Sequence, residues 1–284
     1  MSSVPPGYSS NVCYRHPDRQ SFVLCQRCGR TICGECQTPA AVGVICPECM
    51  KEQRASAPRT RPRILSRSSD RPVVTLGIIA VTAVVFVLQL VTGGWLTQQL
   101  WFAGGYVIPD YTVANGFEPW RMLTAVFAHS TGFILHVALN MYTLWIFGQA
   151  LEELLGRGRF LALYLIAGFG GSLGVLALSD PTTPVVGASG AIFGLMGAFI
   201  VIQRRMGGNM TGLLVLVGIN LVIGFIPGIN VAWQAHLGGL VVGAIAGLVF
   251  VSTRQIRRQG MQIGLLLALS AALLVVTALV AFAR

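Results

Sequence analysis

Seven apolar segments long enough to cross a lipid bilayer constrain this chain more than any other feature. They extend over residues 73–91, 122–148, 160–178, 187–203, 211–226, 231–252 and 262–283. A helix needs about 20 mainly apolar residues to span the hydrocarbon core, and only helices and closed barrels satisfy their backbone groups in lipid. The sequence therefore predicts an all-α membrane protein with seven spans.

The composition agrees with lipid as the solvent for much of the chain. Of the 284 residues, 54% are hydrophobic and only 11% are charged, whereas soluble domains carry about 25% charged residues. The net charge is +10, and eleven of the twenty Lys and Arg residues precede position 72. Because this basic stretch lacks the interleaved aromatic residues of a nucleic-acid binder, we expect it to face the membrane surface and expect no nucleic-acid partner.

All seven cysteines lie in the first fifty residues, where they form regularly spaced pairs. The pairs are Cys13-x-x-His16, Cys25-x-x-Cys28, Cys33-x-x-Cys36 and Cys46-x-x-Cys49. Seven thiols and one imidazole fill two tetrahedral zinc sites. Disulfides are the alternative, but the odd cysteine count argues against them. No secretory signal precedes the first apolar segment, which predicts a cytosolic N-terminus with reduced thiols.

Sequential and interleaved pairing of these ligands are both open, and we favour the interleaved one. It would place one zinc ion between Cys13, His16, Cys33 and Cys36, and the other between Cys25, Cys28, Cys46 and Cys49. Both ions would be held by protein ligands alone, so they would stabilise a small zinc-binding domain over residues 11–50. We expect this domain to bind a protein partner or another part of the chain. Residues 51–71, rich in Ser, Pro, Ala and Arg, are predicted to form a basic flexible linker attracted to anionic lipid.

The charges between the spans indicate the direction in which each span crosses. With a cytosolic N-terminus, loops 149–159, 204–210 and 253–261 are cytosolic, and they contain Arg157, Arg159, Arg204, Arg205, Arg254, Arg257 and Arg258. The outside loops contain one basic residue, Arg121, in addition to the terminal Arg284. This asymmetry follows the positive-inside rule and predicts a multi-pass protein of the cell membrane.

Polar residues inside the spans gather at one depth. The second, fourth and sixth spans all run from outside to inside, and they carry His136 with Asn140, Ser189 and His236. At 1.5 Å per residue, Ser189 and His236 lie within about 5 Å of the same depth in the outer leaflet. The i, i+4 spacing puts His136 and Asn140 on one helix face.

This set of residues fits acyl transfer. Ser189 would attack a peptide carbonyl and His236 would accept its proton. His136 and Asn140, together with the Ser189 backbone N–H, would donate to the oxyanion. No carboxylate lies in the spans to orient His236, so the sequence predicts a Ser–His dyad, with its cavity opening to the outside.

Several of these motifs together resemble the rhomboid family of intramembrane serine proteases. They are Gly187-Ala188-Ser189-Gly190, His136-x-x-x-Asn140 and Ala235-His236-x-x-Gly239-x-x-x-Gly243, with Trp120-Arg121 and Glu153-x-x-Gly156 as further matching features. The resemblance implies a six-helix protease core over residues 72–253, with a seventh transmembrane helix added at 260–284. It also implies transmembrane-helix substrates that are cut near their outer end, and an aromatic ring at Phe193 beneath the catalytic histidine. Residues 11–50 resemble a B-box-type zinc finger.

Two other functions compete with the protease. A catalytically inactive rhomboid-like protein would bind or escort membrane proteins, but such relatives typically lack the serine or the histidine that this chain has. A transporter or channel is disfavoured because the spans show no inverted repeat and no acidic residue to bind a coupling ion.

The stretch from His129 to His136 is longer than is usual in the family, and His129 is assigned no role.

Overall fold

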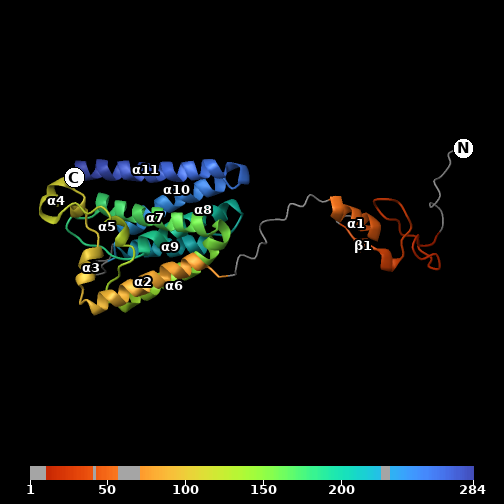
Figure 1. The fold of residues 1–284 in the computed structure, drawn as a ribbon, viewed down its shortest axis with the longest axis horizontal. Helices are drawn as coiled ribbons and strands as arrows, with labels where there is room; N and C mark the ends of the chain where they lie inside the picture. The colour runs from red at the N-terminus through yellow and green to blue at the C-terminus, as the bar shows by residue number, and fades with distance from the viewer. Residues whose placement is uncertain (1–10, 41–42, 57–70, 225–230) are drawn as a thin grey trace. The chain divides into compact units, whose positions relative to one another are not determined.

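A computed structural model describes residues 11–40, 43–56, 71–224 and 231–284 of the chain. The chain separates into two units, Met1–Asp70 and Arg71–Arg284. The described residues of the first unit, 11–56, contain every cysteine, and we term them the cysteine module. The second unit contains every long apolar helix and is termed the helical unit (Figure 1).

The cysteine module has little regular structure. It contains η1 (Gly34–Cys36), β1 (Thr38–Pro39), β2 (Val44–Ile45) and α1 (Pro47–Ser56). The two strands pair antiparallel. Among its described residues, the buried core consists of six cysteines together with Ile32 and Ile45. So small an apolar core cannot offset the conformational entropy of folding.

The linker predicted over residues 51–71 begins later than expected. Helix α1 continues to Ser56, so residues 51–56 belong to the cysteine module. A helix can continue there because residues 51–56 contain Lys, Glu, Gln, Arg and Ala, which are strong helix formers. The remainder of the predicted linker, residues 57–70, lies outside the described residues.

The helical unit is built from long apolar helices joined by short ones. Its elements are α2 (Val73–Val91), α3 (Trp95–Leu100), η3 (Gly104–Tyr106), α4 (Pro109–Asn115), α5 (Arg121–Thr124), α6 (Ile134–Leu155), α7 (Arg157–Leu178), α8 (Ser189–Arg205), α9 (Thr211–Ile223), α10 (Trp233–Ser252), η4 (Ile256–Arg258) and α11 (Gln259–Ala283). In Figure 1, α2 and α6 lie along one side of the unit and α11 along the opposite side, with α7, α8 and α10 between them. Together with α9, which contacts α8 and α10, these helices form a core of six, and α11 is added to it.

Among the residues that the structure describes, five helices are long and apolar enough to span a membrane: α2, α6, α7, α10 and α11. They make this chain a multi-pass membrane protein. The other two predicted spans are shorter, because α8 has 17 residues and α9 has 13 in the described part of the chain. At 1.5 Å per residue they measure about 26 and 20 Å, less than the hydrocarbon thickness of about 30 Å.

The second span was predicted in the wrong place. The sequence predicted it over residues 122–148, but α6 begins only at Ile134 and extends to Leu155. The preceding residues form the short helix α5 and an irregular loop. The loop contains Ser130, Thr131 and Gly132, which favour turns over helix, and its backbone is held by a side chain of α2 described below.

Close packing of α8 on α10 depends on glycine. A methyl group on Gly239 or Gly243 would overlap the backbone carbonyl of Gly190 or Gly194 across the interface. The same holds on a smaller scale at Gly247, where a methyl group would lie 2.8 Å from a Cα atom of α8. These three glycines recur every four residues, and the stripe that they form is the surface along which the two helix backbones meet, as in other membrane helix pairs.

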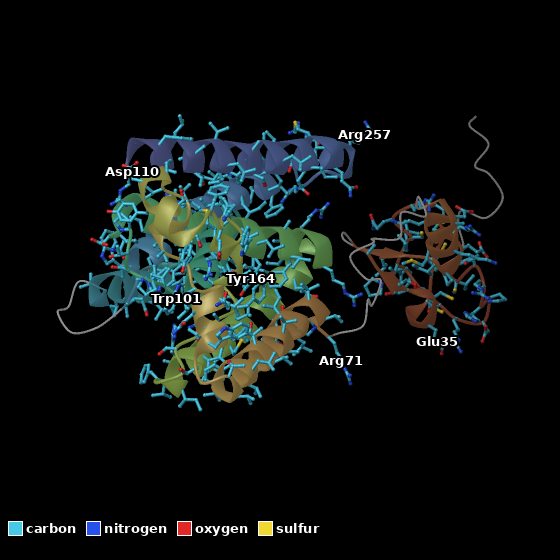
Figure 2. The ribbon with its side chains drawn as sticks, turned by 60° about the vertical axis from the view of Figure 1, so that its left-hand side comes forward. Glu35, Arg71, Trp101, Asp110, Tyr164 and Arg257 are labelled. Carbon is cyan, nitrogen blue, oxygen red and sulfur yellow. The ribbon has the colours of Figure 1, made fainter. Side chains whose placement is uncertain are left out.

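The charged residues separate toward the two ends of the helical unit. Figure 2 shows Arg71 and Arg257 at one end, and Asp110 at the other. Successive long helices alternate in direction, so the basic residues Arg157 and Arg205 fall at the start of α7 and the end of α8. The predicted topology, with the basic loops in the cytosol, depends on this distribution of basic residues.

A buried carboxylate joins α6 to α2, and it is not the one that the sequence singled out. Glu152 is 6% exposed and accepts hydrogen bonds from Val74 N, Thr75 N and Thr75 Oγ1 at 2.8–2.9 Å. It therefore satisfies N–H groups in the first turn of α2, where negative charge also interacts favourably with the helix dipole. Glu153, the predicted family residue, is exposed, because one residue along a helix turns the side chain by about 100°.

Candidate active site and candidate metal centres

Ser189 is the first residue of α8. Gly187 has φ +127°, a conformation that only glycine adopts readily, so the helix cannot extend back through this residue. The first backbone bond within this helix runs from Ile192 N to Ala188 O. The N–H groups of the first turn, including that of Ser189, thus have no partner within the helix and carry its positive partial charge.

His236 lies on α10, beside the face of α8 that carries Ser189. Its imidazole stacks on the ring of Phe193 with a centroid distance of 4.0 Å and an angle of 8° between the planes. Phe193 follows Ser189 by one helical turn on the same face, so the imidazole lies over that face. The aromatic support predicted for His236 is confirmed. Among the described residues, His236 Nδ1 is buried and has no hydrogen-bond partner, which agrees with a dyad that lacks a carboxylate.

His136 points its free ring nitrogen at the turn before Ser189. The backbone N–H of Ser130 donates to His136 Nδ1 at 3.4 Å, so the proton of a neutral ring resides on Nε2. A methyl group on Gly187 would lie 2.9 Å from His136 Nε2 and 3.9 Å from Ser189 Oγ. Glycine therefore leaves the space in which a reacting carbonyl oxygen could meet an Nε2 donor.

Asn140 lies one turn after His136 on α6 and is 7% exposed. Its Nδ2 donates to the backbone carbonyl of His136 at 2.8 Å. A primary amide has two N–H groups, so one remains for another acceptor. Donation by Asn140 to an oxyanion stays a prediction.

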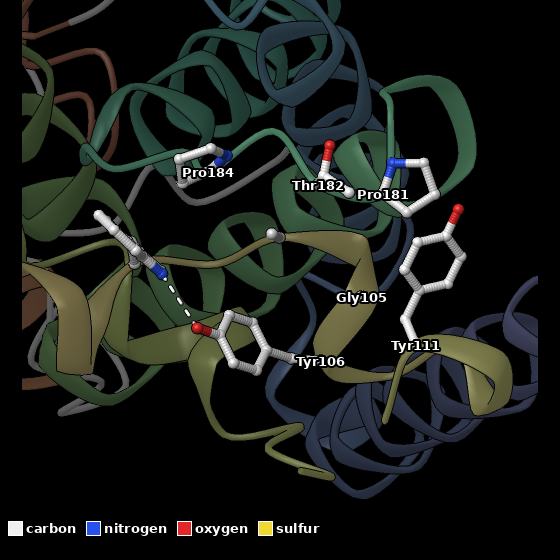
Figure 3. Close-up of a pocket in the computed structure, with 8 residues that line it drawn as sticks. Gly105, Tyr106, Tyr111, Pro181, Thr182 and Pro184 are labelled. Carbon is white, nitrogen blue, oxygen red and sulfur yellow. Dashed lines mark hydrogen bonds between the residues drawn. The ribbon is translucent and has the colours of Figure 1, made fainter. Parts of the chain in front are cut away.

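A small cavity adjoins the start of α8. It measures about 30 Å³ and is lined by residues that include Ser189, Gly187, Gly190 and Ala235, which is room for one or two water molecules. A larger hollow of about 200 Å³ lies elsewhere, between Trp101, Tyr106, Tyr111, Pro181 and neighbouring residues (Figure 3). Its wall includes a hydrogen bond from Trp101 Nε1 to Tyr106 OH, but no serine, cysteine or histidine lines it. The smaller cavity adjoins Ser189 and therefore belongs to the candidate active site, although neither His136 nor His236 is among the residues that line it.

The loop that leads into α5 is fixed by Arg121, the second residue of the Trp-Arg motif. The Arg121 guanidinium is 4% exposed and donates to the Glu118 carboxylate and to the Gln98 carbonyl. It also lies over the Tyr106 ring, 4.1 Å from the centroid. This motif thus organises the wall of the larger hollow and does not reach Ser189.

In the cysteine module, the eight predicted ligands form two groups, and the interleaved pairing is the one observed. One group contains Cys13, His16, Cys33 and Cys36, and the other contains Cys25, Cys28, Cys46 and Cys49. Within each group all ligand atoms lie within 4.8 Å of one another. Either group could hold a metal ion.

The distances within the groups fit tetrahedral zinc. With Zn–S of 2.3 Å and Zn–N of about 2.05 Å, tetrahedral geometry requires S···S of about 3.8 Å and S···N of about 3.6 Å. Cys28 Sγ lies 3.8 Å from Cys46 Sγ. His16 Nδ1 lies 3.8, 3.4 and 3.5 Å from the sulfurs of Cys13, Cys33 and Cys36.

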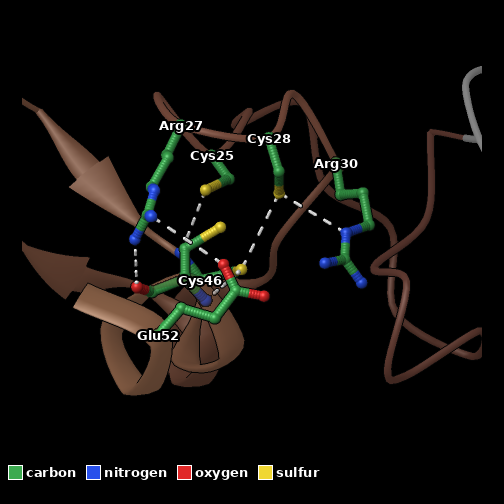
Figure 4. A network of polar contacts seen from close by, with 7 residues as sticks. Cys25, Arg27, Cys28, Arg30, Cys46 and Glu52 are labelled. Atoms are coloured by element: carbon green, nitrogen blue, oxygen red, sulfur yellow. Dashed lines mark hydrogen bonds and ion pairs between the residues drawn. The ribbon is translucent and has the colours of Figure 1, made fainter. Parts of the chain in front are cut away.

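Hydrogen-bond donors contact two sulfurs of the four-cysteine group, those of Cys25 and Cys28. Arg30 Nε donates to Cys28 Sγ at 3.4 Å, and the backbone N–H of Cys46 donates to Cys25 Sγ at 3.2 Å (Figure 4). Burial raises the pKa of the Cys25 thiol, but backbone N–H groups of Cys28, Cys46 and Arg27 outweigh it and lower the pKa to about 6. Donors of this kind orient the ligands of metal sites in proteins.

Two buried residues near Ser189 were missed or set aside by the sequence reasoning. Gln89 on α2 is fully buried, and so is His129, to which no role was assigned. The signal that could have found Gln89 is its position as a polar residue inside an otherwise apolar span, because such residues are costly in lipid.

Comparison with known proteins agrees with this geometry. A family model described as "Rhomboid domain" matches residues 116–253. The chain is 36% identical over 183 residues to rhomboid protease GluP of Bacillus subtilis, covering 63% of this chain and 35% of that protein. It is 37% identical over 150 residues to RHOMBOID-like protein 6, mitochondrial, of Arabidopsis thaliana, covering 50% of this chain and 47% of that protein.

A third relative is matched over most of its own length. The chain is 35% identical over 150 residues to the putative rhomboid protease YdcA of Bacillus subtilis, covering 51% of this chain and 73% of that protein. Against the first two relatives, the chain spans only about a third to a half of their length. The match includes the segments that carry Ser189 and His236, and the chain belongs to the rhomboid family.

Proposed function

We propose that this protein is an intramembrane serine endopeptidase that cuts transmembrane-helix substrates near the outer membrane face. The observation that carries the proposal is the convergence at the start of α8. Ser189 lies at the helix N-terminus, His236 stacks on Phe193 beside it, and His136 Nε2 faces the preceding turn. A nucleophile, a base and an oxyanion donor thus come from three different helices.

The reaction follows from these positions. Ser189 Oγ attacks the peptide carbonyl carbon while its proton passes to His236, and the C=O π electrons move to the oxygen. The negative oxygen is stabilised by His136 Nε2–H and by the N–H groups of the first turn of α8. The peptide C–N bond then breaks, and the His236 imidazolium gives its proton to the departing amine. Water, deprotonated by His236, hydrolyses the acyl-enzyme and restores Ser189.

The alternative is an inactive rhomboid-like protein that binds or escorts membrane proteins. A binding protein needs neither a reactive serine nor a conformation at Gly187 that leaves space before it. Here Gly187 keeps a gap that a single methyl group would fill. This gap favours the enzyme over the binding protein.

Cleavage of a model transmembrane substrate by the purified chain in lipid vesicles tests the proposal. Ser189→Ala and His236→Ala should each abolish cleavage without changing the melting temperature. Ser270→Ala is a matched control, because Ser270 lies on another membrane helix, α11, and within the described part of the chain its hydroxyl bonds only to Leu266 O of its own helix. Equal cleavage by the wild type and Ser189→Ala would show that the protein is not a serine protease.

The oxyanion donors can be tested separately. His136→Ala should lower kcat by about 100- to 1000-fold, with little change in KM, because the lost donor acts only on the developing charge. Asn140→Ala should act in the same direction. A higher KM with an unchanged kcat would mean that these residues bind substrate or pack.

We also propose that the cysteine module holds two structural zinc ions, serves protein interaction or regulation, and lies in the cytosol while the active site opens outward. Support for this comes from the tetrahedral spacing of the ligand atoms and from the basic residues at one end of the helical unit. Metal analysis of the purified chain should find two zinc ions per chain. A protease added outside sealed spheroplasts should leave the cysteine module intact.

A further inference from the structure

A buried side chain of α2 holds the loop that precedes α6. Gln89 Oε1 accepts a hydrogen bond from His129 N at 3.0 Å, and Gln89 Nε2 donates to His129 O at 2.9 Å and to Thr97 Oγ1 at 2.8 Å. All three hydrogen-bonding groups of the carboxamide are thus used. Both Gln89 and His129 are fully buried, where leaving such groups unpaired costs about 1–3 kcal/mol each.

The ring of His129 continues this chain of contacts to the residue before Ser189. His129 Nε2 accepts a hydrogen bond from Ala188 N at 3.4 Å, and Ala188 is the N-terminal cap of α8. The neighbouring Gly187 N donates to Ala125 O at 3.0 Å. The backbone before Ser189 is therefore held at two points by the loop that Gln89 fixes.

The same loop also orients His136. His129 and His136 have ring centroids 5.1 Å apart, and the intervening Ser130 N donates to His136 Nδ1. A shift of His129 would move the nucleophile's turn and the oxyanion donor relative to each other. A misplacement of about 1 Å in an active site can cost about 100-fold in rate.

We infer that Gln89 and His129 are positioning residues for the reaction, and that Gln89 acts by fixing the His129 backbone while the His129 ring fixes the turn before Ser189. The inference rests on the proposed function for its effect on rate. Its effect on the backbone around Ala188 is independent of that function. Neither residue touches the reacting atoms in this assignment.

The test uses the full chain in lipid vesicles and four substitutions. His129→Phe keeps a planar ring and removes the acceptor, whereas His129→Gln places an amide group near the position of Nε2. Gln89→Glu keeps the shape and removes both N–H donors. Thr82→Val is the matched control, since Thr82 is also fully buried on α2 and its hydroxyl has no partner among the described residues.

Two measurements are made on each variant: kcat and KM for a model substrate, and amide hydrogen exchange of the segment 186–192. His129→Phe should lower kcat by about 10- to 100-fold with KM within a factor of two, and should accelerate exchange in the segment. His129→Gln should recover much of both, Gln89→Glu should show a smaller loss than His129→Phe, and Thr82→Val should match the wild type.

Unchanged exchange in His129→Phe, or a His129→Gln variant no better than His129→Phe, overturns the inference. If His129→Phe fails to fold, the comparison of His129→Gln and Gln89→Glu with Thr82→Val decides. A wild type that cleaves no substrate overturns the proposed function. In that case accelerated exchange in His129→Phe still supports the positioning role.

Discussion

The cysteine module and the helical unit are stabilised in different ways. In the module, six cysteines and two isoleucines make up the described buried core, and the ligand groups hold the chain together. In the helical unit, backbones meet directly across glycine, and buried polar side chains satisfy helix ends. With the proposed zinc ions, the module would depend on bound metal for its structure, whereas the helical unit depends on the fit between its own helices.

The same comparison distinguishes groups that stabilise a fold from groups that could take part in a reaction. Both ligand groups in the module are complete with protein atoms, so a bound ion would have no open position for catalysis. The start of α8 in the helical unit has N–H groups with no partner within the helix and a cavity beside a serine. Stability of the first region and reactivity of the second should therefore respond to different perturbations.

The largest expected effect is that of metal removal. A strong chelator should unfold residues 11–56, because structural zinc contributes about 10–16 kcal/mol of apparent binding free energy to such domains. Amide hydrogen exchange should show lost protection throughout the module and unchanged protection in α7, α8 and α10. If the module keeps its protection from amide exchange after complete metal removal, its structure does not depend on metal and the comparison is wrong.

A chain that lacks residues 1–62 sharpens the same contrast. It should cleave a model substrate in detergent at close to the wild-type rate, because the proposed catalytic groups all lie in the helical unit. An inactive but correctly inserted chain would mean that the module acts on the catalytic helices.

A substitution at the α8–α10 interface should have the next largest effect. Gly243→Ala adds a methyl group that overlaps the Gly194 carbonyl, and forced overpacking typically costs about 1–3 kcal/mol. Gly264→Ala on α11 is the control, since nothing lies within 4 Å of its added methyl group. Its effect should stay within about 1 kcal/mol. Unfolding in mixed micelles measures both, and equal stability of the two variants would mean that the helices do not pack as described.

A loss of similar size is expected at the buried carboxylate. Glu152→Gln replaces an acceptor of three hydrogen bonds by an amide with one oxygen, and hydrogen bonds to a charged group contribute about 1.5–3 kcal/mol. Glu153→Gln, one residue along and exposed, should leave the free energy of unfolding unchanged. The same mixed-micelle unfolding measurement distinguishes them, and a larger effect of Glu153→Gln would reverse the assignment.

The smallest effect is expected at an exposed ion pair of the module. Arg19 lies 2.7 Å from Glu35, but the side chains are 42% and 67% exposed, and such pairs contribute less than about 1 kcal/mol. Arg19→Gln should therefore barely change zinc affinity. Arg30→Gln should weaken it more, since Arg30 also donates to Cys28 Sγ. Competition with a chromophoric chelator measures both affinities, and equal losses would show that the sulfur contact contributes nothing.

Much of the fold and of the candidate site could be predicted from patterns that depend on near neighbours. Cys-x-x-Cys spacing identified the candidate ligands because two residues of a tight turn can reach one ion. The Gly239-x-x-x-Gly243 motif lies at the contact with α8, because residues four apart lie about one turn apart on the same helix face. The ends of helices were predicted less accurately, as at Ile134 and Ser189. They depend on which distant groups form hydrogen bonds with the N–H and C=O groups of the terminal turns.

The sequence by itself determined the class of the protein, the eight candidate metal ligands and the four residues proposed for catalysis, since each is encoded in composition or in short spacing. Only the tertiary structure decided which glutamate is buried, where α8 begins and which side chains hold the turn before Ser189. Gln89 and His129 are 40 residues apart, and His129 and Ala188 are 59 apart. Hydrogen bonds over such separations follow from how the helices pack, and no local periodicity records them.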